Sequence, residues 1–145
     1  MNHAVIGPVN NPLVSRPFGG GDIAQLRAVL ARLVTQAGLG GERSNDFVLA
    51  VDEILTNAVR HGGGAGHLEV WVETGRIWFR ITDRGSGMTV EPPSAPPAPT
   101  QLGGRGLWIA RGLTDEMTIA TGPDGTEVAG AVNLPAPAES TMDHR

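Results

Sequence analysis

The sequence has no cysteine among its 145 residues, which excludes disulfide bonds, zinc sites built on thiolates and a thiol nucleophile. Lysine is absent as well, so all eleven basic residues are arginine. The formal net charge is −4, and the chain therefore lacks the broad positive surface that binding to a nucleic-acid backbone requires. These absences argue against direct contact with nucleic acid.

Long hydrophobic runs are also missing from the sequence. No apolar run approaches the roughly 18–20 residues that cross a bilayer, and the N-terminus lacks the charged and then apolar pattern of a secretory signal. We therefore expect no membrane contact and a cytoplasmic location. At 145 residues the chain has the size of a single domain with one core.

The sequence divides into an arm, a folded domain and a tail. Residues 1–20 contain several prolines and glycines and predict an irregular arm with one edge strand near residues 13–18. The folded domain is expected over residues 21–134, and residues 135–145 form a loose polar tail. Five prolines within residues 88–102 predict a lid inside this domain, because too few residues follow for a second core.

Two helices are predicted in the first half of the chain. Apolar residues at helical spacing mark the first, with Asp22 as its N-cap, Gln25 as the capping-box partner of Asp22, and Gly38 as its end. The second and longer helix is expected to begin with Ser44 as its cap and to end at glycines 62–64.

Strands are predicted next, from the alternation of apolar and polar residues. Residues 67–73 and 76–82 form a hairpin around a tight turn at residues 74–75. Trp71 and Trp78 fall on the face opposite the buried side chains of this hairpin. That face is either covered or is a surface for a partner.

A third helix and two further strands complete the expected domain. The helix covers residues 107–113, and the strands lie near residues 116–121 and 126–134. The last strand is poor in bulk over residues 129–131. We therefore expect a weak edge of the sheet at this strand.

The polar pair Glu53 and Asn57 lies within the second helix. The two residues are four apart, so they share one helix face beside the apolar stripe that includes Val51, Ile54 and Ala58. A carboxylate next to a carboxamide can hold a water molecule and a hydrated divalent cation. The same spacing is also typical of a solvated helix face, so the pair alone does not define a site.

Two glycine-containing segments follow the hairpin. Asp83 comes just after a strand and precedes Gly85 and Gly87, a pattern that lets a flat ligand such as adenine approach the backbone and the carboxylate, but that is also found in ordinary turns. Residues 103–106 open the third helix, whose free N–H groups can bind an anion. Arg105 adds a permanent cation that can reach a terminal phosphate.

In this order, the segments resemble the Bergerat-fold ATP-binding superfamily, which includes topoisomerase, histidine-kinase and mismatch-repair ATPase domains. The resemblance is greatest to the anti-sigma factor serine/threonine kinases, which carry a Glu-x-x-x-Asn-Ala-x-x-His segment like Glu53 to His61. It covers residues 22–134 and implies an α+β, two-layer sandwich with a mixed, mainly antiparallel sheet and helices on one face. ATP would lie between the helices and the lid.

The resemblance also implies a role for each matching residue. Glu53 would be the general base, Asn57 would coordinate Mg²⁺ at the phosphates, and Asp83 would recognise the adenine amino group. His61 is interpreted as a side chain that caps the helix end rather than as a catalyst. The further nucleotide-binding positions implied by the resemblance are Gly85, Gly87, Gly104, Arg105, Gly106, Leu107 and Thr126.

The function implied by the resemblance is that of a Mg²⁺- and ATP-dependent serine/threonine kinase. Its partners would be a sigma factor, which it binds, and an anti-sigma factor antagonist, which it phosphorylates, and it would form a homodimer. Two alternatives stay open. One is a non-catalytic protein that switches partners under control of a bound nucleotide. The other is an ATPase with water as the acceptor, although the sequence shows no transducer domain.

Overall fold

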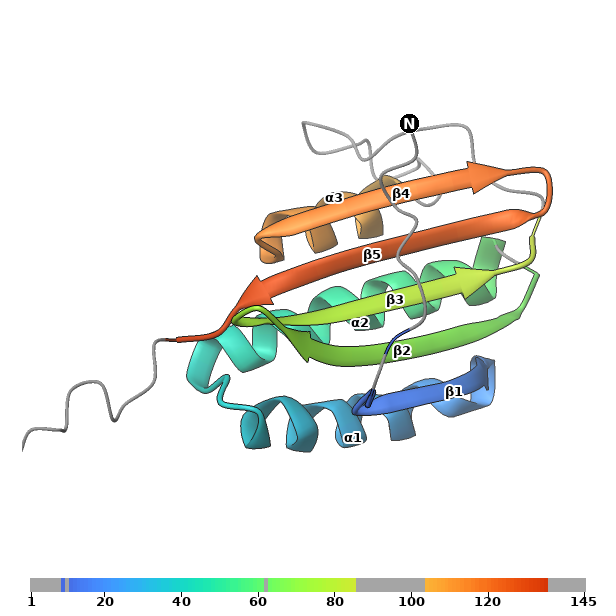
Figure 1. Cartoon of the computed structure of the whole chain (residues 1–145). Helices are drawn as coiled ribbons and strands as arrows, with labels where there is room; N and C mark the ends of the chain where they lie inside the picture. Colours follow the sequence, from blue (N-terminus) through green and yellow to red (C-terminus); the bar gives the residue numbers. More distant parts are fainter. Residues whose placement is uncertain (1–8, 10, 62, 86–103, 136–145) are drawn as a thin grey trace, which may run out of the picture.

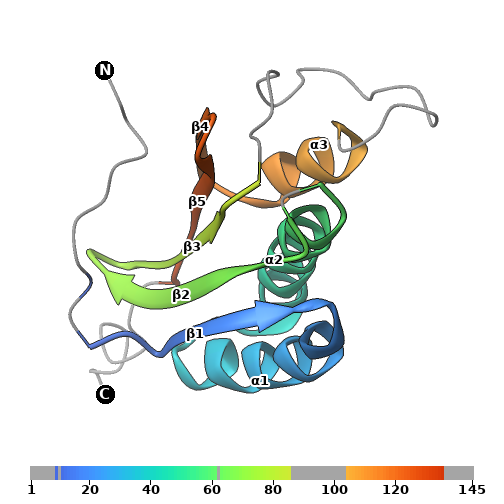
Figure 2. The same ribbon diagram turned by 90° about the vertical axis from the view of Figure 1, so that its right-hand side faces the viewer.

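The computed structural model describes residues 9, 11–61, 63–85 and 104–135. Within these ranges the chain forms a sheet with three α-helices on one face, as Figures 1 and 2 show from two directions. The elements in chain order are β1 (Val14–Gly19), the 3-10 turn η1 (Gly20–Asp22), α1 (Ile23–Gln36), α2 (Gly41–His61), β2 (Ala65–Glu73), β3 (Arg76–Asp83), α3 (Gly104–Leu113), β4 (Glu116–Gly122) and β5 (Gly125–Asn133). This two-layer α+β arrangement confirms the predicted fold class.

The five strands are ordered β1-β2-β3-β5-β4, and all four of these pairings are antiparallel. The last strand, β5, therefore lies between β3 and β4 in the interior of the sheet. The segment that connects β3 to α3 contains the predicted lid, residues 88–102, which lies outside the described residues.

The β2–β3 hairpin confirms the predicted turn. Thr74 and Gly75 both have positive φ values, 51° and 76°, which is the backbone of a two-residue hairpin turn of type I′. Beyond this turn, Trp71 and Trp78 are directly paired across the strands. Their rings stack at a centroid distance of 6.0 Å, on the face of the sheet that the helices leave open.

The core lies between the helices and the inner face of the sheet. At its centre, the rings of Phe47 from α2 and Phe79 from β3 meet edge to face with centroids 5.8 Å apart. A Cβ atom built on Gly130 of β5 would lie 2.6 Å from Cζ of Phe79. The low bulk of β5 thus makes room for this ring, and the expectation of a weak sheet edge at β5 is wrong.

The start of α1 differs from the prediction, although its end agrees. Asp22 occupies the N-cap position, but its side chain caps no N–H of α1. Its Oδ2 accepts a hydrogen bond of 2.7 Å from the backbone N–H of Gly19 instead, so Asp22 closes the preceding turn and the capping box with Gln25 is wrong. The helix ends before Gly38, whose φ of 110° suits glycine.

The start of α2 also differs from the prediction. The helix begins at Gly41, whose φ is 59°, and Ser44 therefore lies inside the first turn. Ser44 is buried, and its Oγ lies 3.5 Å from Oγ1 of Thr35 in α1. The hydroxyl thus joins the two helices, and its predicted role as the cap of α2 is wrong.

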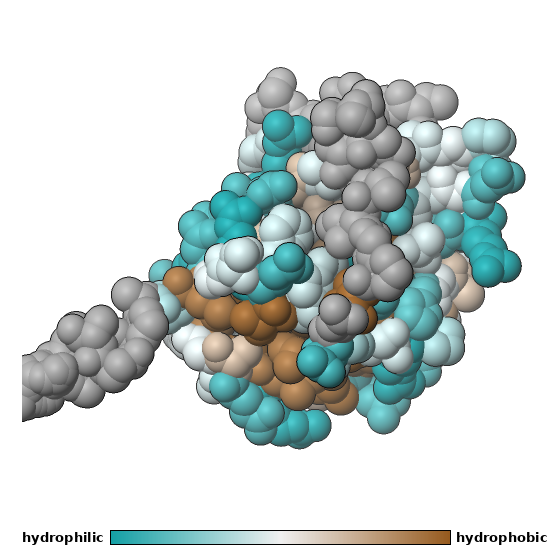
Figure 3. Space-filling model, viewed as in Figure 1, coloured by the Kyte–Doolittle hydropathy of each residue, from teal (hydrophilic) through white to brown (hydrophobic). Residues whose placement is uncertain are grey.

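The open face of the sheet combines apolar side chains with ion pairs. In Figure 3, which looks onto this face, apolar surface gathers in the lower half and hydrophilic surface surrounds it. Arg80 of β3 binds Glu69 of β2 and lies over the ring of Trp71. No helix in the described part of the chain has both the length and the apolar character needed to cross a membrane.

Candidate functional site

The flank of α2 that faces α3 carries the polar pair predicted from the sequence. Glu53 and Asn57 are both half-buried there, and Gly106 in the first turn of α3 lies against them. A Cβ atom built on Gly106 would lie 2.9 Å from Oε1 of Glu53 and 3.8 Å from Oδ1 of Asn57. The structure thus brings Gly106 next to a polar pair that is distant from it in the sequence, and a side chain at position 106 would force the carboxylate of Glu53 or α3 to shift.

The carboxyl group of Glu53 has a perturbed affinity for protons. Burial raises the pKa of Glu53, the negative charge of the neighbouring Asp52 raises it further, and the positive charge of Arg60 lowers it. A base with a raised pKa takes up a proton more readily near neutral pH, as general-base catalysis requires. The sequence predicts Arg60 on the outer face of the helix, and it is exposed there. Its spacing of seven residues from Glu53, two helical turns, places it on the same side of α2.

The side-chain amide of Asn57 has unused hydrogen-bonding capacity. Its Nδ2 atom is buried and has no hydrogen-bond partner among the residues that the structure describes. A buried polar group left unpaired costs about 1–3 kcal/mol, and a ligand that engages the amide would offset this cost. The unpaired N–H is a donor, so it fits an acceptor on a ligand, such as a phosphate oxygen of a nucleotide. The amide oxygen of the same side chain is of the ligand type that Mg²⁺ takes.

Asp83 is the last residue of β3 and lies near the C-terminal end of α2. Its side chain is buried, and Oδ1 accepts a hydrogen bond of 2.9 Å from the backbone N–H of Gly85. Thr126 of β5 is directly opposite Asp83 in the register. At the neighbouring Gly125, a Cβ atom would lie only 2.0 Å from the carbonyl oxygen of Asp83. The carboxylate is thus held by a close-packed backbone, and its Oδ2 can accept a hydrogen bond from a ligand.

The loops that follow α2 and β3 lie side by side. A Cβ atom on Gly63 would lie 3.7 Å from Cα of Gly85, so the C-terminal end of α2 adjoins the segment that begins with Asp83. Of the remaining predicted residues, Gly104 begins α3 and Leu107 is buried. Arg105 is exposed. Gly87 lies outside the described residues.

Sequence and structure comparisons place this geometry in a known family. Residues 20–129 match the family model described as the histidine kinase-like ATPase domain. The chain belongs to this family. Its membership implies that the chain binds ATP. No sequence among the curated proteins matches the chain.

Two solved structures illustrate the family likeness. The crystal structure of the RsbU and RsbW domains of Rv1364c from Mycobacterium tuberculosis is 19% identical, with a TM-score of 0.61 over 87% of this chain. The blue-light activated histidine kinase EL346 from Erythrobacter litoralis is 27% identical, with a TM-score of 0.50 over 70% of this chain. Each match spans 33% of the other chain, so this chain is similar to one part of each larger protein.

Proposed function

We propose that this histidine kinase-like ATPase domain is a serine/threonine protein kinase of the anti-sigma factor type, dependent on ATP and Mg²⁺. The observation that carries the proposal is the arrangement on one flank of α2. There, the carboxyl group of Glu53, with its raised pKa, lies beside the buried and unpaired amide of Asn57, and Gly106 approaches both.

Each residue of the site has a role in this proposal. Glu53 accepts the proton of the attacking serine or threonine hydroxyl, and Asn57 holds Mg²⁺. Asp83 accepts a hydrogen bond from the adenine amino group. When bound, Mg²⁺ and ATP supply the phosphoryl group and neutralise the charge around it. The remaining contacts to the nucleotide come from the positions named above, Gly85, Gly87, Gly104, Arg105, Gly106, Leu107 and Thr126.

The partners in this proposal are a sigma factor, which the protein binds, and an anti-sigma factor antagonist, which it phosphorylates. Its proposed location is the cytoplasm and its proposed assembly is a homodimer. Support comes from the segment Glu53 to His61, which resembles that of the anti-sigma factor kinases, and from the fold shared with a structure that includes an RsbW domain.

A phosphotransfer assay with radiolabelled ATP tests this function. With Mg²⁺ present, the protein should label a serine or threonine of an antagonist encoded beside it. Glu53→Gln should slow the labelling at least about a hundredfold. Glu42→Gln removes a carboxylate from the exposed first turn of the same helix and should leave the labelling intact.

The same assay separates the kinase from the non-catalytic alternative. If the wild-type protein binds nucleotide and exchanges partners but labels no antagonist, the kinase proposal is wrong. Partner exchange that survives in Glu53→Ala would then support a switch that is controlled by nucleotide binding alone.

A further inference from the structure

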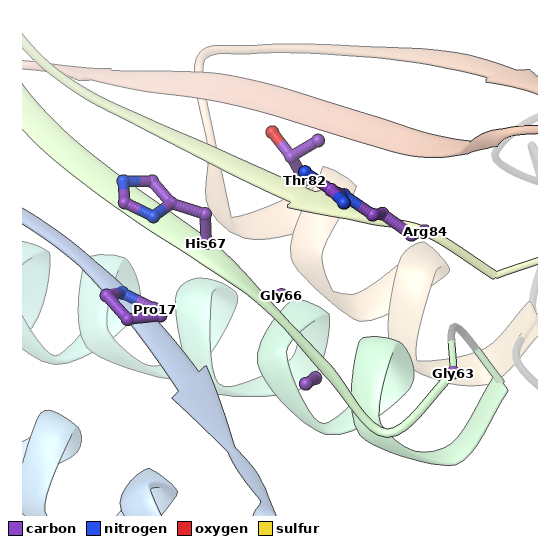
Figure 4. A pocket seen from close by; sticks show the side chains of 7 residues that line it. Pro17, Gly63, Gly66, His67, Thr82 and Arg84 are labelled. Atoms are coloured by element: carbon purple, nitrogen blue, oxygen red, sulfur yellow. The ribbon is translucent and has the colours of Figure 1, made fainter.

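A pocket lies on the open face of the sheet, at the same end as Asp83 (Figure 4). Its volume is about 430 Å³, within the range of roughly 300–1,000 Å³ of small-molecule sites. Pro17, His67 and Thr82 lie in one row across β1, β2 and β3. The complete lining is Pro17, Gly63, Ala65, Gly66, His67, Thr82 and Arg84. This row faces away from the helices, so the pocket and Glu53 lie on opposite faces of the sheet.

The floor of this pocket is flat and largely apolar. Gly66 leaves the backbone of β2 bare, and the ring of Pro17 lies on the neighbouring strand (Figure 4). A Cβ atom on Gly66 would lie 2.4 Å from the carbonyl oxygen of Thr82 and 2.8 Å from Cζ of Phe18. Packing on the core side therefore requires a glycine at this position, while on the pocket side the backbone of Gly66 forms part of the floor.

Hydrogen-bonding groups converge on one side of this floor. Arg84 and Thr82 both line the pocket (Figure 4), and neither side chain has a hydrogen-bond or ion-pair partner within the described ranges. One ring nitrogen of His67, Nε2, lies 3.0 Å from Oγ of Ser15, which leaves Nδ1 for a ligand. A permanent cation, a hydroxyl and an imidazole thus border the pocket.

The carboxylates near the pocket form no ion pair with Arg84 within the described ranges. Asp83 precedes it in the chain, but its Oδ1 accepts from the N–H of Gly85. Glu127 is opposite Thr82 in the register but does not line the pocket. Burial raises the pKa of Glu127, and the charge of Arg80 opposes that effect. The guanidinium group of Arg84 is therefore available to an anion.

We propose that this pocket binds a small, flat carboxylic acid. The guanidinium group of Arg84 is a planar fork that matches a carboxylate with two parallel hydrogen bonds, and the hydroxyl of Thr82 adds a third. The apolar body of the ligand lies over Pro17 and the bare backbone of Gly66. This assignment does not depend on the function proposed for the opposite face of the sheet.

An NMR titration of the whole protein with benzoate tests the assignment. The backbone amide signals of Gly66, His67 and Arg84 should shift saturably, whereas those of Asn57 and Gly106 on the other face should not. The shifts therefore separate this pocket from the nucleotide site, whether or not the protein is a kinase. Benzoate that causes no saturable shifts at the pocket would overturn the proposal.

Variants and a second probe make the test specific. Arg84→Gln should weaken benzoate binding at least about tenfold, since it removes a charge-assisted contact. Arg32→Gln removes the same charge from an exposed position of α1 and should leave the affinity unchanged. Equal weakening in both would contradict the proposal. Thr82→Val, which keeps a β-branched residue in the strand, should weaken benzoate binding as well. If Arg84→Gln does not fold, Thr82→Val provides the test. Inorganic phosphate that binds the pocket more tightly than benzoate would overturn the assignment to a carboxylic acid.

Discussion

The two flanks of α2 differ in whether their carboxylates have hydrogen-bond partners, although the two carboxylates belong to consecutive residues. Asp52, on the flank that faces α1, accepts hydrogen bonds from Nη2 and Nε of Arg27 at 3.0 and 3.3 Å. Glu53, on the flank that faces α3, has no such partner within the described ranges, and its pKa is raised mainly by burial. One flank uses its polar groups to join two helices, and the other leaves them without a polar partner among the described residues.

The same contrast extends along the helix. Toward α1, the hydroxyl of Ser44 meets that of Thr35. Toward α3, the buried Nδ2 of Asn57 is left unpaired. Unpaired buried groups and raised carboxyl pKa values reduce stability, and proteins tolerate such costs at functional sites. The α3 flank is therefore where substitution should affect function more than folding.

Glu53→Gln should have the largest effect among the predictions. Loss of the proton acceptor should slow phosphoryl transfer by about 10²–10⁴-fold, with nucleotide affinity nearly unchanged because the neutral amide has the same shape. Asp52→Asn, on the other flank, should change the rate only a few-fold. Single-turnover kinetics measure both, and equal losses in the two variants would contradict the assigned difference between the flanks.

Gly106→Ala should have the next largest effect. The added methyl group would lie 2.9 Å from Oε1 of Glu53, so either α3 or the carboxylate must shift, and nucleotide affinity should fall about tenfold or more. Gly112→Ala is the matched control in the same helix, because its Cβ atom would meet nothing within 4 Å. The control should bind normally and gain about 0.5–1 kcal/mol of stability. Calorimetric titration and thermal unfolding measure the two effects.

The sheet was largely predictable from the sequence because its signals are local. The turn at Thr74 and Gly75 and the alternation around it placed two strands, and the same alternation placed Trp71 opposite the core. In contrast, the position of β5 inside the sheet depends on Gly130, which is small because Phe79, from another strand, occupies the space beside it. No local pattern in the sequence records such a contact.

The site was only partly predictable for the same reason. The spacing of Glu53 and Asn57 and the glycines before α3 were visible as motifs. The approach of Gly106 to Glu53 joins elements that are distant in sequence, as does the ion pair between Arg27 and Asp52. The predicted cap at Ser44 failed because tertiary packing against Thr35, rather than the local backbone, uses that hydroxyl.

A pair of charge changes should move the pH dependence of transfer in opposite directions. The rate should rise with pH through the pKa of Glu53, since only the ionised carboxylate accepts a proton. Asp52→Asn removes a charge that raises this pKa, so the rise should move to lower pH, and Arg60→Gln should move it to higher pH. Rate profiles that move in the same direction for both variants would contradict the electrostatic account.

The smallest effects are expected on stability. Because the pKa of Glu53 is raised in the folded protein, the stability it contributes is complete below its ordinary value of 4.5 and is lost as the pH rises through the folded-state pKa. Glu53→Gln should therefore raise the free energy of unfolding at neutral pH, and the gain should disappear at acidic pH. Arg27→Ala breaks a partly exposed ion pair and should cost at most about 1 kcal/mol. Urea denaturation at two pH values measures both changes.

The most direct test of the nucleotide site is a calorimetric titration of ATP with Mg²⁺ into three proteins. Asn57 and Asn45 are both asparagines of α2, but Asn45 is exposed and lines the groove toward α1. We expect the wild-type protein and Asn45→Ala to bind ATP with similar affinity, and the affinity of Asn57→Ala to be at least about tenfold lower. No heat with the wild-type protein, or equal affinity for the two variants, would contradict this expectation.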